Sequence, residues 1–325
     1  MAGGFALNTR QKFAPLPALV KPAGGGMTQR AIPRTGLLAR LWLRISITIA
    51  GGAAGVPNVL GVCSALRRVR LVANSGLEIF SVTGPGWFYM LQHFLESEYS
   101  PLTGQNVGNS AVANGTFNLD MVIPVCVSML DFTGLVLVQN EQVLLTLEVD
   151  WEADTTVWAA GGATVTGTVT PEMEFFSVPL LPEDRPDLSV AHVILEDTRV
   201  IAGAGESIYE PLRTPTYLQL IHGSGFLAAG GADNFTATRL RIEQSNYLFD
   251  GDNQVHNMLW RAYHGYARPL GVFGYDWLAS SGLGNYGGGR DRVNTSTITA
   301  FESTINFAAA GNLTTIRRML IKLAS

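Results

Sequence analysis

Apolar and polar side chains alternate with a period of two in several segments of this chain, and this alternation constrains its fold more than any other feature. From Leu41 to Ile49, aliphatic residues occupy every odd position, and Trp, Arg, Ser and Thr occupy the even ones. The segments 143–152 and 164–170 alternate in the same way. Successive side chains of a β-strand point to opposite faces, so this pattern predicts half-buried strands. We therefore expect an all-β chain.

Shorter apolar runs bounded by turn residues predict the remaining strands. These strands are expected at 66–73, 77–82, 121–130, 135–138, 172–178, 190–195, 216–222, 237–243, 271–277, 297–307 and 313–323. The last segment also fits helical spacing, but we favour a strand. Short helices are expected at 86–96 and 254–266, where apolar residues recur at helical spacing. In the second helix the apolar face would consist of Val255, Met258, Leu259 and Ala262.

The length of the chain, 325 residues, suits two domains better than one core. Leu181–Asp187 contains two prolines and three acidic residues and is the most linker-like segment. We therefore predict one domain at 34–182 and another at 183–325. Residues 1–33 are rich in Gly, Pro and Ala and lack a sustained period, which predicts a flexible basic arm outside both domains.

A short repeat relates the two predicted domains. Arg68–Leu71 and Arg239–Ile242 share the order Arg, aliphatic, Arg, aliphatic, and they lie 171 residues apart. Each is predicted to be a strand that is followed by a turn and then by a helix containing aromatic residues. The shared order of elements indicates duplication of one structural unit.

The charge content of the chain points to self-association. Charged residues make up 15% of the sequence, against about 25% in a typical soluble domain. A surface so poor in charge is expected to be buried against other copies of the chain. No signal peptide or membrane-spanning segment is expected, because the most hydrophobic stretch, 41–62, alternates and is interrupted by Arg44 and Pro57.

The charges are also distributed unevenly along the chain. The first 77 residues contain ten basic residues and no acidic one, whereas the rest carries a net charge of −14. Basic residues near the N-terminus are candidates for contact with lipid headgroups or nucleic acid. These candidates are Arg10, Lys12, Lys21, Arg30 and Arg34. For basic residues further along, such as Arg40 and Arg44, a solvated strand face is the simpler explanation.

We find no pattern that predicts catalysis, a cofactor or a metal site. The five histidines include no pair at metal-binding spacing, and Cys63 and Cys126 lie in apolar runs as buried thiols do. Gly223–Ala228 matches a dinucleotide fingerprint, but no helix is predicted after it. Glu148, Asp150 and Glu152 share one face of a predicted strand, where neighbouring carboxylates are more often structural than a glycosidase pair. The chain is therefore not expected to be an enzyme.

The chain resembles the double jelly-roll major capsid proteins of tailless, icosahedral, often membrane-containing bacterial viruses, the PRD1-adenovirus-type lineage. The resemblance covers nearly the whole chain from about Pro33. It rests on the basic N-terminal segment, the strand–turn–helix unit in each half, the proline-containing linker and the low charge content. The run LRRVRLVANSGLEIF at 66–80 and the segment Phe175–Pro186 are typical of such proteins.

This resemblance implies two tandem eight-stranded jelly-roll β-barrels with short helices in loops. Three chains would form a trimer of pseudo-sixfold outline, and trimers would tile the capsid of the virion after synthesis in the host cytoplasm. The loops 97–118 and 279–292 would form towers or trimer contacts. The basic arm would face an internal membrane or the genome, and vertex or penton proteins would be further partners.

Two other functions fit the same sequence. The first is a different phage structural β-sandwich, such as a spike, vertex or tail protein. The second is a carbohydrate-binding or glycan-cleaving β-sandwich, with Trp151, Trp158 and Trp277 arranged around Glu152.

Overall fold

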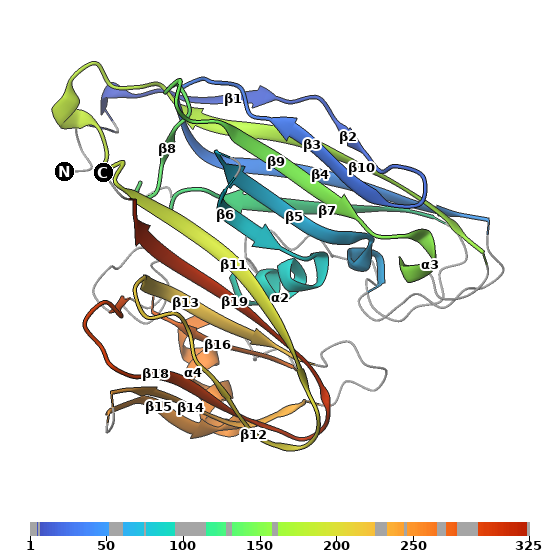
Figure 1. The fold of residues 1–325 in the computed structure, drawn as a ribbon, viewed down its shortest axis with the longest axis vertical. Coiled ribbons are helices and arrows are strands. Elements are labelled where there is room, and N and C mark those ends of the chain that lie inside the picture. The colour runs from blue at the N-terminus through green and yellow to red at the C-terminus, as the bar shows by residue number, and fades with distance from the viewer. Residues whose placement is uncertain are drawn as a thin grey trace. The chain divides into compact units, whose positions relative to one another are not determined.

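The computed structural model divides into two compact units (Figure 1). Unit 1 comprises Met1–Leu91, Leu95–Leu195 and Leu323–Ser325, and unit 2 comprises Gln92–Phe94 and Glu196–Lys322. The structure describes residues 5, 7–51, 61–74, 76–94, 115–127, 132–157, 162–224, 233–243, 246–264, 271–277 and 292–323. The predicted loops 97–118 and 279–292 therefore lie largely outside the described residues.

Unit 1 contains two antiparallel arrangements of four principal strands each. The first has the order β1 (Gln11–Pro15), β10 (Thr164–Phe176), β4 (Leu37–Ala50) and β7 (Gly115–Pro124). The second has the order β3 (Gly26–Ala31), β9 (Leu145–Trp151), β5 (Leu66–Ala73) and β6 (Leu77–Val82). Two short strands, β2 (Leu19–Val20) and β8 (Val136–Leu137), pair with β10 and β4.

Unit 2 repeats this plan. One arrangement has the order β11 (Val190–Ile201), β19 (Gly311–Lys322), β13 (Thr216–Gly223) and β16 (Val272–Asp276). The other has the order β12 (Gly205–Tyr209), β18 (Phe301–Phe307), β14 (Phe235–Ile242) and β15 (Asn246–Asp252). The short strand β17 (Val293–Asn294) pairs with β13. The last segment of the chain is thus a strand, as predicted.

The two units share one strand order. When the principal strands of each unit are numbered one to eight along the chain, they lie in the orders 1-8-3-6 and 2-7-4-5 in both units. Two antiparallel sheets connected in this way form a jelly roll. The predicted all-β fold with two tandem eight-stranded jelly rolls is therefore confirmed for the part of the chain that the structure describes.

The alternation in the sequence explains how these sheets bury a core. In β4 the five aliphatic side chains at odd positions from Leu41 to Ile49 are almost completely buried, while Arg44 is exposed and Arg40 is half-buried. Each fully buried aliphatic side chain contributes about 1.5–3 kcal/mol relative to an exposed one. One face of the strand therefore supplies the core and the other stays polar.

The N-terminal segment differs from the expected free arm. Gln11–Pro15 pairs with β10, and Gly26–Ala31 pairs with β9, so these residues form the first two strands of unit 1. Phe5 packs in a core cluster with Leu37, Leu135 and Phe176. Both strands lie at the ends of their sheets and bury few side chains, which is why the sequence shows no clear period there. Their pairing comes from backbone hydrogen bonds, which carry little sequence signal.

The predicted linker lies between the principal strands of the two units. Leu181–Asp187 follows β10 and precedes β11, and it contains the short 3-10 helix η2 (Pro182–Asp184). The boundary between the two compact units falls later in the chain, between Leu195 and Glu196 within β11. The domain boundary at residue 183 therefore stays a prediction.

In the described part of the chain, the element order contains four further helices with defined bounds. They are η1 (Gly61–Ala65), α2 (Gly84–Phe94), α3 (Asp154–Val157) and α4 (Asn253–His264). The helices α2 and α4 match the predicted ones, and each follows the fifth strand of its unit. Within the described residues, no helix is long and apolar enough to cross a membrane.

The predicted apolar face of α4 does not pack into the core. His256 and Trp260 are buried, whereas Val255 and Met258 are among the exposed apolar residues. The ring of His256 packs against the rings of Phe249 and Phe273. This aromatic packing orients the helix, and hydropathy alone does not reveal it because histidine scores as polar.

His222 on β13 is a fully buried titratable group in the core of unit 2. Its Nδ1 lies 2.9 Å from Thr315 Oγ1, and its Nε2 lies 3.2 Å from Ser303 Oγ. Burial, with a smaller contribution from the charge of Arg199, lowers the pKa of His222 to about 3. The ring is therefore neutral in the folded protein at ordinary pH.

We predict that His222 makes the protein sensitive to acid. Between its normal pKa of about 6.5 and about 3, the unfolded chain binds a proton that the folded chain excludes, so the free energy of unfolding falls as pH falls. The substitution His222→Gln should reduce this dependence. Urea unfolding of both proteins at about pH 7 and about pH 4 measures it. Equal pH dependence in the two proteins would contradict the assignment.

Candidate interaction surface

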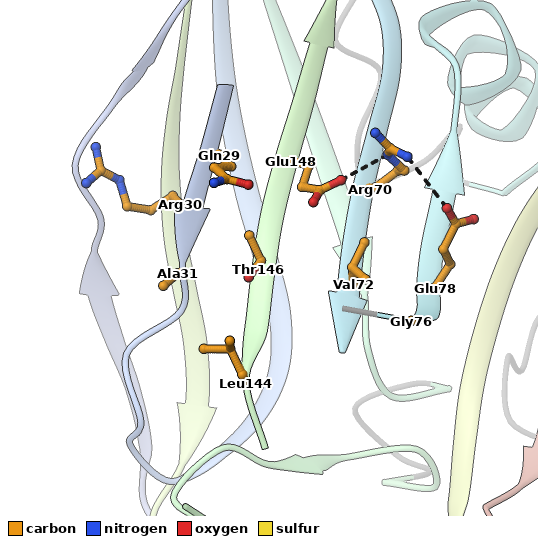
Figure 2. A pocket seen from close by; sticks show the side chains of 10 residues that line it. All are labelled: Gln29, Arg30, Ala31, Arg70, Val72, Gly76, Glu78, Leu144, Thr146 and Glu148. Atoms are coloured by element: carbon orange, nitrogen blue, oxygen red, sulfur yellow. Dashed lines mark ion pairs between the residues drawn. The ribbon is translucent and has the colours of Figure 1, made fainter. Parts of the chain in front are cut away.

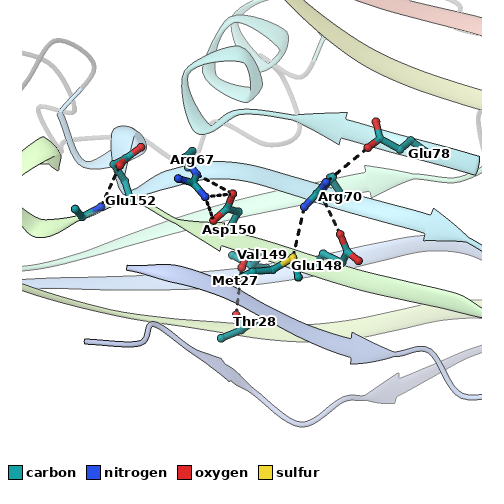
Figure 3. Close-up of polar contacts among 10 residues, drawn as sticks. Met27, Thr28, Arg67, Arg70, Glu78, Glu148, Val149, Asp150 and Glu152 are labelled. Carbon is teal, nitrogen blue, oxygen red and sulfur yellow. Dashed lines mark hydrogen bonds and ion pairs between the residues drawn. The ribbon is translucent and has the colours of Figure 1, made fainter. Parts of the chain in front are cut away.

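Charged side chains form a paired row across one face of the sheet β3-β9-β5-β6 (Figure 3). Arg70 of β5 lies opposite Glu148 of β9 in the register, with Arg70 Nε 3.1 Å from Glu148 Oε2. Arg70 Nη1 also lies 3.8 Å from Glu78 Oε1 on β6. One arginine thus bridges carboxylates on the two neighbouring strands.

A second pair extends this row. Arg67 donates two hydrogen bonds to Asp150, Nε to Oδ2 and Nη2 to Oδ1, each 2.7 Å long. The carboxylate of Asp150 raises the pKa of Arg67 above its usual value. Two parallel bonds of this kind fix the relative orientation of the two planar groups.

One of these pairs recurs in unit 2. Arg241 of β14 lies opposite Glu302 of β18 in the register, and the two side chains form an ion pair. Arg239 forms a second pair with Asp250 of β15, with Nε 3.0 Å from Oδ1. Arg70 and Arg241 are the second arginines of the sequence repeat, and both face a glutamate on the seventh strand of their unit. The repeat therefore corresponds to a duplicated cross-strand ion pair.

A depression of about 740 Å³ lies on the charged face in unit 1 (Figure 2). Its lining comes from four strands and the turns at their ends. The described lining residues are Gln29, Arg30, Ala31, Arg70, Val72, Gly76, Glu78, Leu144, Thr146 and Glu148. Both glutamates pair with Arg70, so neither is left as an isolated charge. This lining offers hydrogen bonds and apolar contact to a partner but no histidine or cysteine nucleophile.

The five basic residues near the N-terminus do not lie in one environment. Arg10, Lys12 and Arg34 are exposed, and Arg30 is half-buried at the depression. Lys21 is buried, and its Nζ lies 2.5 Å from Asp154 Oδ1, so it forms an ion pair within unit 1. The contact of these residues with lipid or nucleic acid stays a prediction.

The structure does not assemble the glycan-binding site considered above. Trp151 is buried and donates a hydrogen bond to Thr28, and Trp277 is also buried. Glu152 accepts a hydrogen bond from the backbone N–H of Ala153. Trp158 lies outside the described residues. Stacking on a sugar ring needs exposed aromatic faces, which neither described tryptophan provides.

The other candidate groups are dispersed or buried. Cys63 and Cys126 are buried free thiols, and burial raises the pKa of Cys63 to about 12. His192, His222 and His256 are buried, while the side chains of His93 and His264 lie outside the described part. Within the described ranges, no three His, Cys, Asp or Glu residues are placed to hold a metal ion.

Comparison with solved structures identifies the fold. A chain in the structure of Sulfolobus turreted icosahedral virus aligns with a TM-score of 0.72 at 11% identity, over 96% of this chain and 91% of that one. A chain of the PBCV-1 virus capsid aligns with a TM-score of 0.67 at 11% identity, over 98% and 95%. The major capsid protein of bacteriophage PM2 aligns with a TM-score of 0.56 at 11% identity, over 97% and 98%.

These likenesses extend over both units and establish a double jelly-roll fold. No protein-family model matches the chain, and no curated protein matches its sequence. Sequence reasoning found the arginine repeat but missed its glutamate partners. The signal was present, since Glu148 was already assigned to a strand, but pairing between strands cannot be read from periodicity.

We predict that the duplicated pairs contribute equally and weakly to stability. Half-exposed ion pairs contribute about 0.2–1 kcal/mol, so a double-mutant cycle of Arg70→Ala and Glu148→Ala should give a coupling energy in that range. A matched cycle at Arg241 and Glu302 should give a similar value. Urea unfolding measures both. A coupling of several kcal/mol in only one unit would contradict their equivalence.

Proposed function

We propose that this chain is a viral major capsid protein whose copies assemble into an icosahedral shell. The observation that carries the proposal is the jelly-roll strand order, present twice in one chain, together with an alignment over 96% of this chain to a chain of an icosahedral virus. The other aligned chains come from a virus capsid and a phage major capsid protein. Two similar jelly rolls in one chain suit a shell subunit that must present similar edges to its neighbours.

The surface chemistry supports a structural role and not an enzymatic one. On the sheet faces Arg70 pairs with Glu148 and Arg241 pairs with Glu302, and the chain carries only 15% charged residues. Large permanent interfaces between proteins are poor in charge. A subunit that buries much of its surface in a shell needs this composition.

The oligomer that we propose is a trimer. Three copies contribute six similar jelly rolls, which can close into a ring of pseudo-sixfold outline. Such trimers would then tile the shell and meet vertex or penton proteins at its corners. We assign the virus to the bacterial, tailless type on the resemblance in sequence organisation described above.

Assembly of the purified protein tests this function. Light scattering at increasing protein concentration should show trimers, and electron microscopy should show hexagonal-outline particles or shells of uniform size. Both measurements use the full chain alone, without any other virion protein. A stable monomer at all concentrations, or specific binding of an oligosaccharide, would contradict the proposal.

We further propose that the exposed basic residues near the N-terminus face the interior of the shell. Arg10 directly precedes the edge strand β1 and Lys12 lies in it. Arg34 is exposed and follows β3. The double variant Arg10→Ala and Lys12→Ala should bind anionic vesicles or single-stranded DNA several-fold more weakly than the wild type at low salt. Cosedimentation measures binding to the vesicles, and fluorescence anisotropy measures binding to the DNA. Unchanged binding to both would contradict this role.

A further inference from the structure

The N-terminal segment, which we define as Phe5 with residues 7–21, lies on unit 1 in the way that a separate peptide binds a sheet edge. Its two strands, β1 and β2, pair with β10. Phe5, Leu16, Leu19 and Lys21 are buried, while most residues between them are exposed. Strand addition of this kind combines backbone hydrogen bonds with pockets for a few side chains.

The segment is bound to a part of unit 1 that lies far along the chain. Gln11 Nε2 donates a hydrogen bond of 2.5 Å to Glu174 Oε1. The backbone N–H of Lys21 donates to the carbonyl of Gly167 at 2.8 Å. Both partners belong to β10, so the β10 of a second copy of the chain would offer the same contacts.

The segment and its binding site carry complementary charges. Arg10, Lys12 and Lys21 are the charged residues of the segment, which contains no acidic one. The site carries Glu174 in the stretch that pairs with β1, and Asp154 Oδ1 lies 2.5 Å from Lys21 Nζ. Complementary charges favour the encounter of the segment with such a site on any copy of the chain.

A glycine-containing hinge, residues 22–25, connects the segment to β3. Gly24 and Gly25 have φ angles of 78° and 90°. The backbone N–H of Gly25 donates a hydrogen bond to the carbonyl of Pro22 at 3.1 Å, which folds the hinge into a turn. Because glycine adopts positive and negative φ about equally, the hinge can open at low conformational cost. In an extended form it spans up to about 14 Å.

We propose that the N-terminal segment is exchanged in the assembled protein, so that it pairs with β10 of a second copy. The proposal rests on the proposed function, in which many copies meet in one shell. The exchanged and unexchanged forms share the contacts of the segment and differ in the hinge, so exchange costs little. Association at high local concentration favours the exchanged form, because each segment then ties two copies together.

Mixing two single-cysteine variants of the full chain tests the exchange. Val20 and Thr168 lie opposite each other in the register of β2 and β10. Opposite residues of antiparallel strands have Cα atoms close enough for a disulfide. Val20→Cys and Thr168→Cys are mixed as monomers, assembled together and oxidised, so that a bond between these positions must join two chains. We expect disulfide-linked dimers in non-reducing electrophoresis.

Thr48→Cys and Thr116→Cys form the matched control. Their hydroxyl oxygens lie 2.9 Å apart across β4 and β7, a pairing that does not involve the segment. Mixed and oxidised in the same way, these two variants should remain single chains. The described native thiols, Cys63 and Cys126, are buried and form no disulfide.

The corresponding double variants provide a second measurement. In dilute monomer both pairs, Val20→Cys with Thr168→Cys and Thr48→Cys with Thr116→Cys, should close within one chain, which shows that the register is kept. After assembly and oxidation, the first pair should give covalent multimers, whereas the second should still give single chains.

The outcomes separate the inference from the function on which it rests. If the wild type forms no trimers or shells, the proposed function fails and the exchange falls with it. If the wild type assembles but the Val20→Cys and Thr168→Cys mixture stays as single chains, while the double variant closes within one chain, only the exchange is overturned. Dimers at equal yield in the control mixture, or in either variant alone, would also overturn it.

Discussion

The whole structure depends on pairing the first principal strand of each unit with the last one. In unit 1 the five residues of β1 pair with the end of β10, and in unit 2 β11 lies beside β19. This pairing satisfies backbone groups that would otherwise form an open edge. It also brings the beginning and the end of each roll together. A second roll can then follow the first through a short linker, and the chain can carry two copies of one design.

Duplication preserved some contacts and changed others. The arginine–glutamate pair between the fourth and seventh strands persists in both units, at Arg70–Glu148 and Arg241–Glu302. Such half-exposed pairs contribute little stability. They do disfavour a register shift, since a slip of one residue would move each arginine to the apolar face. The first arginines of the repeat have different partners, because Arg68 donates a hydrogen bond to Ser81 whereas Arg239 pairs with Asp250.

The sequence predicts those parts of the fold that leave a periodic signal. The strands around Leu41–Ile49 and Leu145–Trp151 follow from alternation, and α2 and α4 follow from helical spacing. The strands β1 and β3 could not be predicted, because edge strands bury few side chains and depend on backbone hydrogen bonds. The inner face of α4 was also missed, since only the surrounding rings of Phe249 and Phe273 show that His256 belongs to the core. The cross-strand charge pairs need the register, which a single sequence does not contain.

Pairing of charges within each sheet has a consequence for assembly. An isolated charge loses its hydration when a neighbour covers it, and this desolvation opposes association. Arg70 already lies between Glu78 and Glu148, and Arg67 already binds Asp150 through two hydrogen bonds, so each carries its counter-charge into an interface. In the proposed assembly, a neighbouring copy could cover this face without leaving Arg67 or Arg70 unpaired, and apolar contacts elsewhere would supply the attraction. Repeated, identical interfaces need this combination of weak repulsion and specific contact.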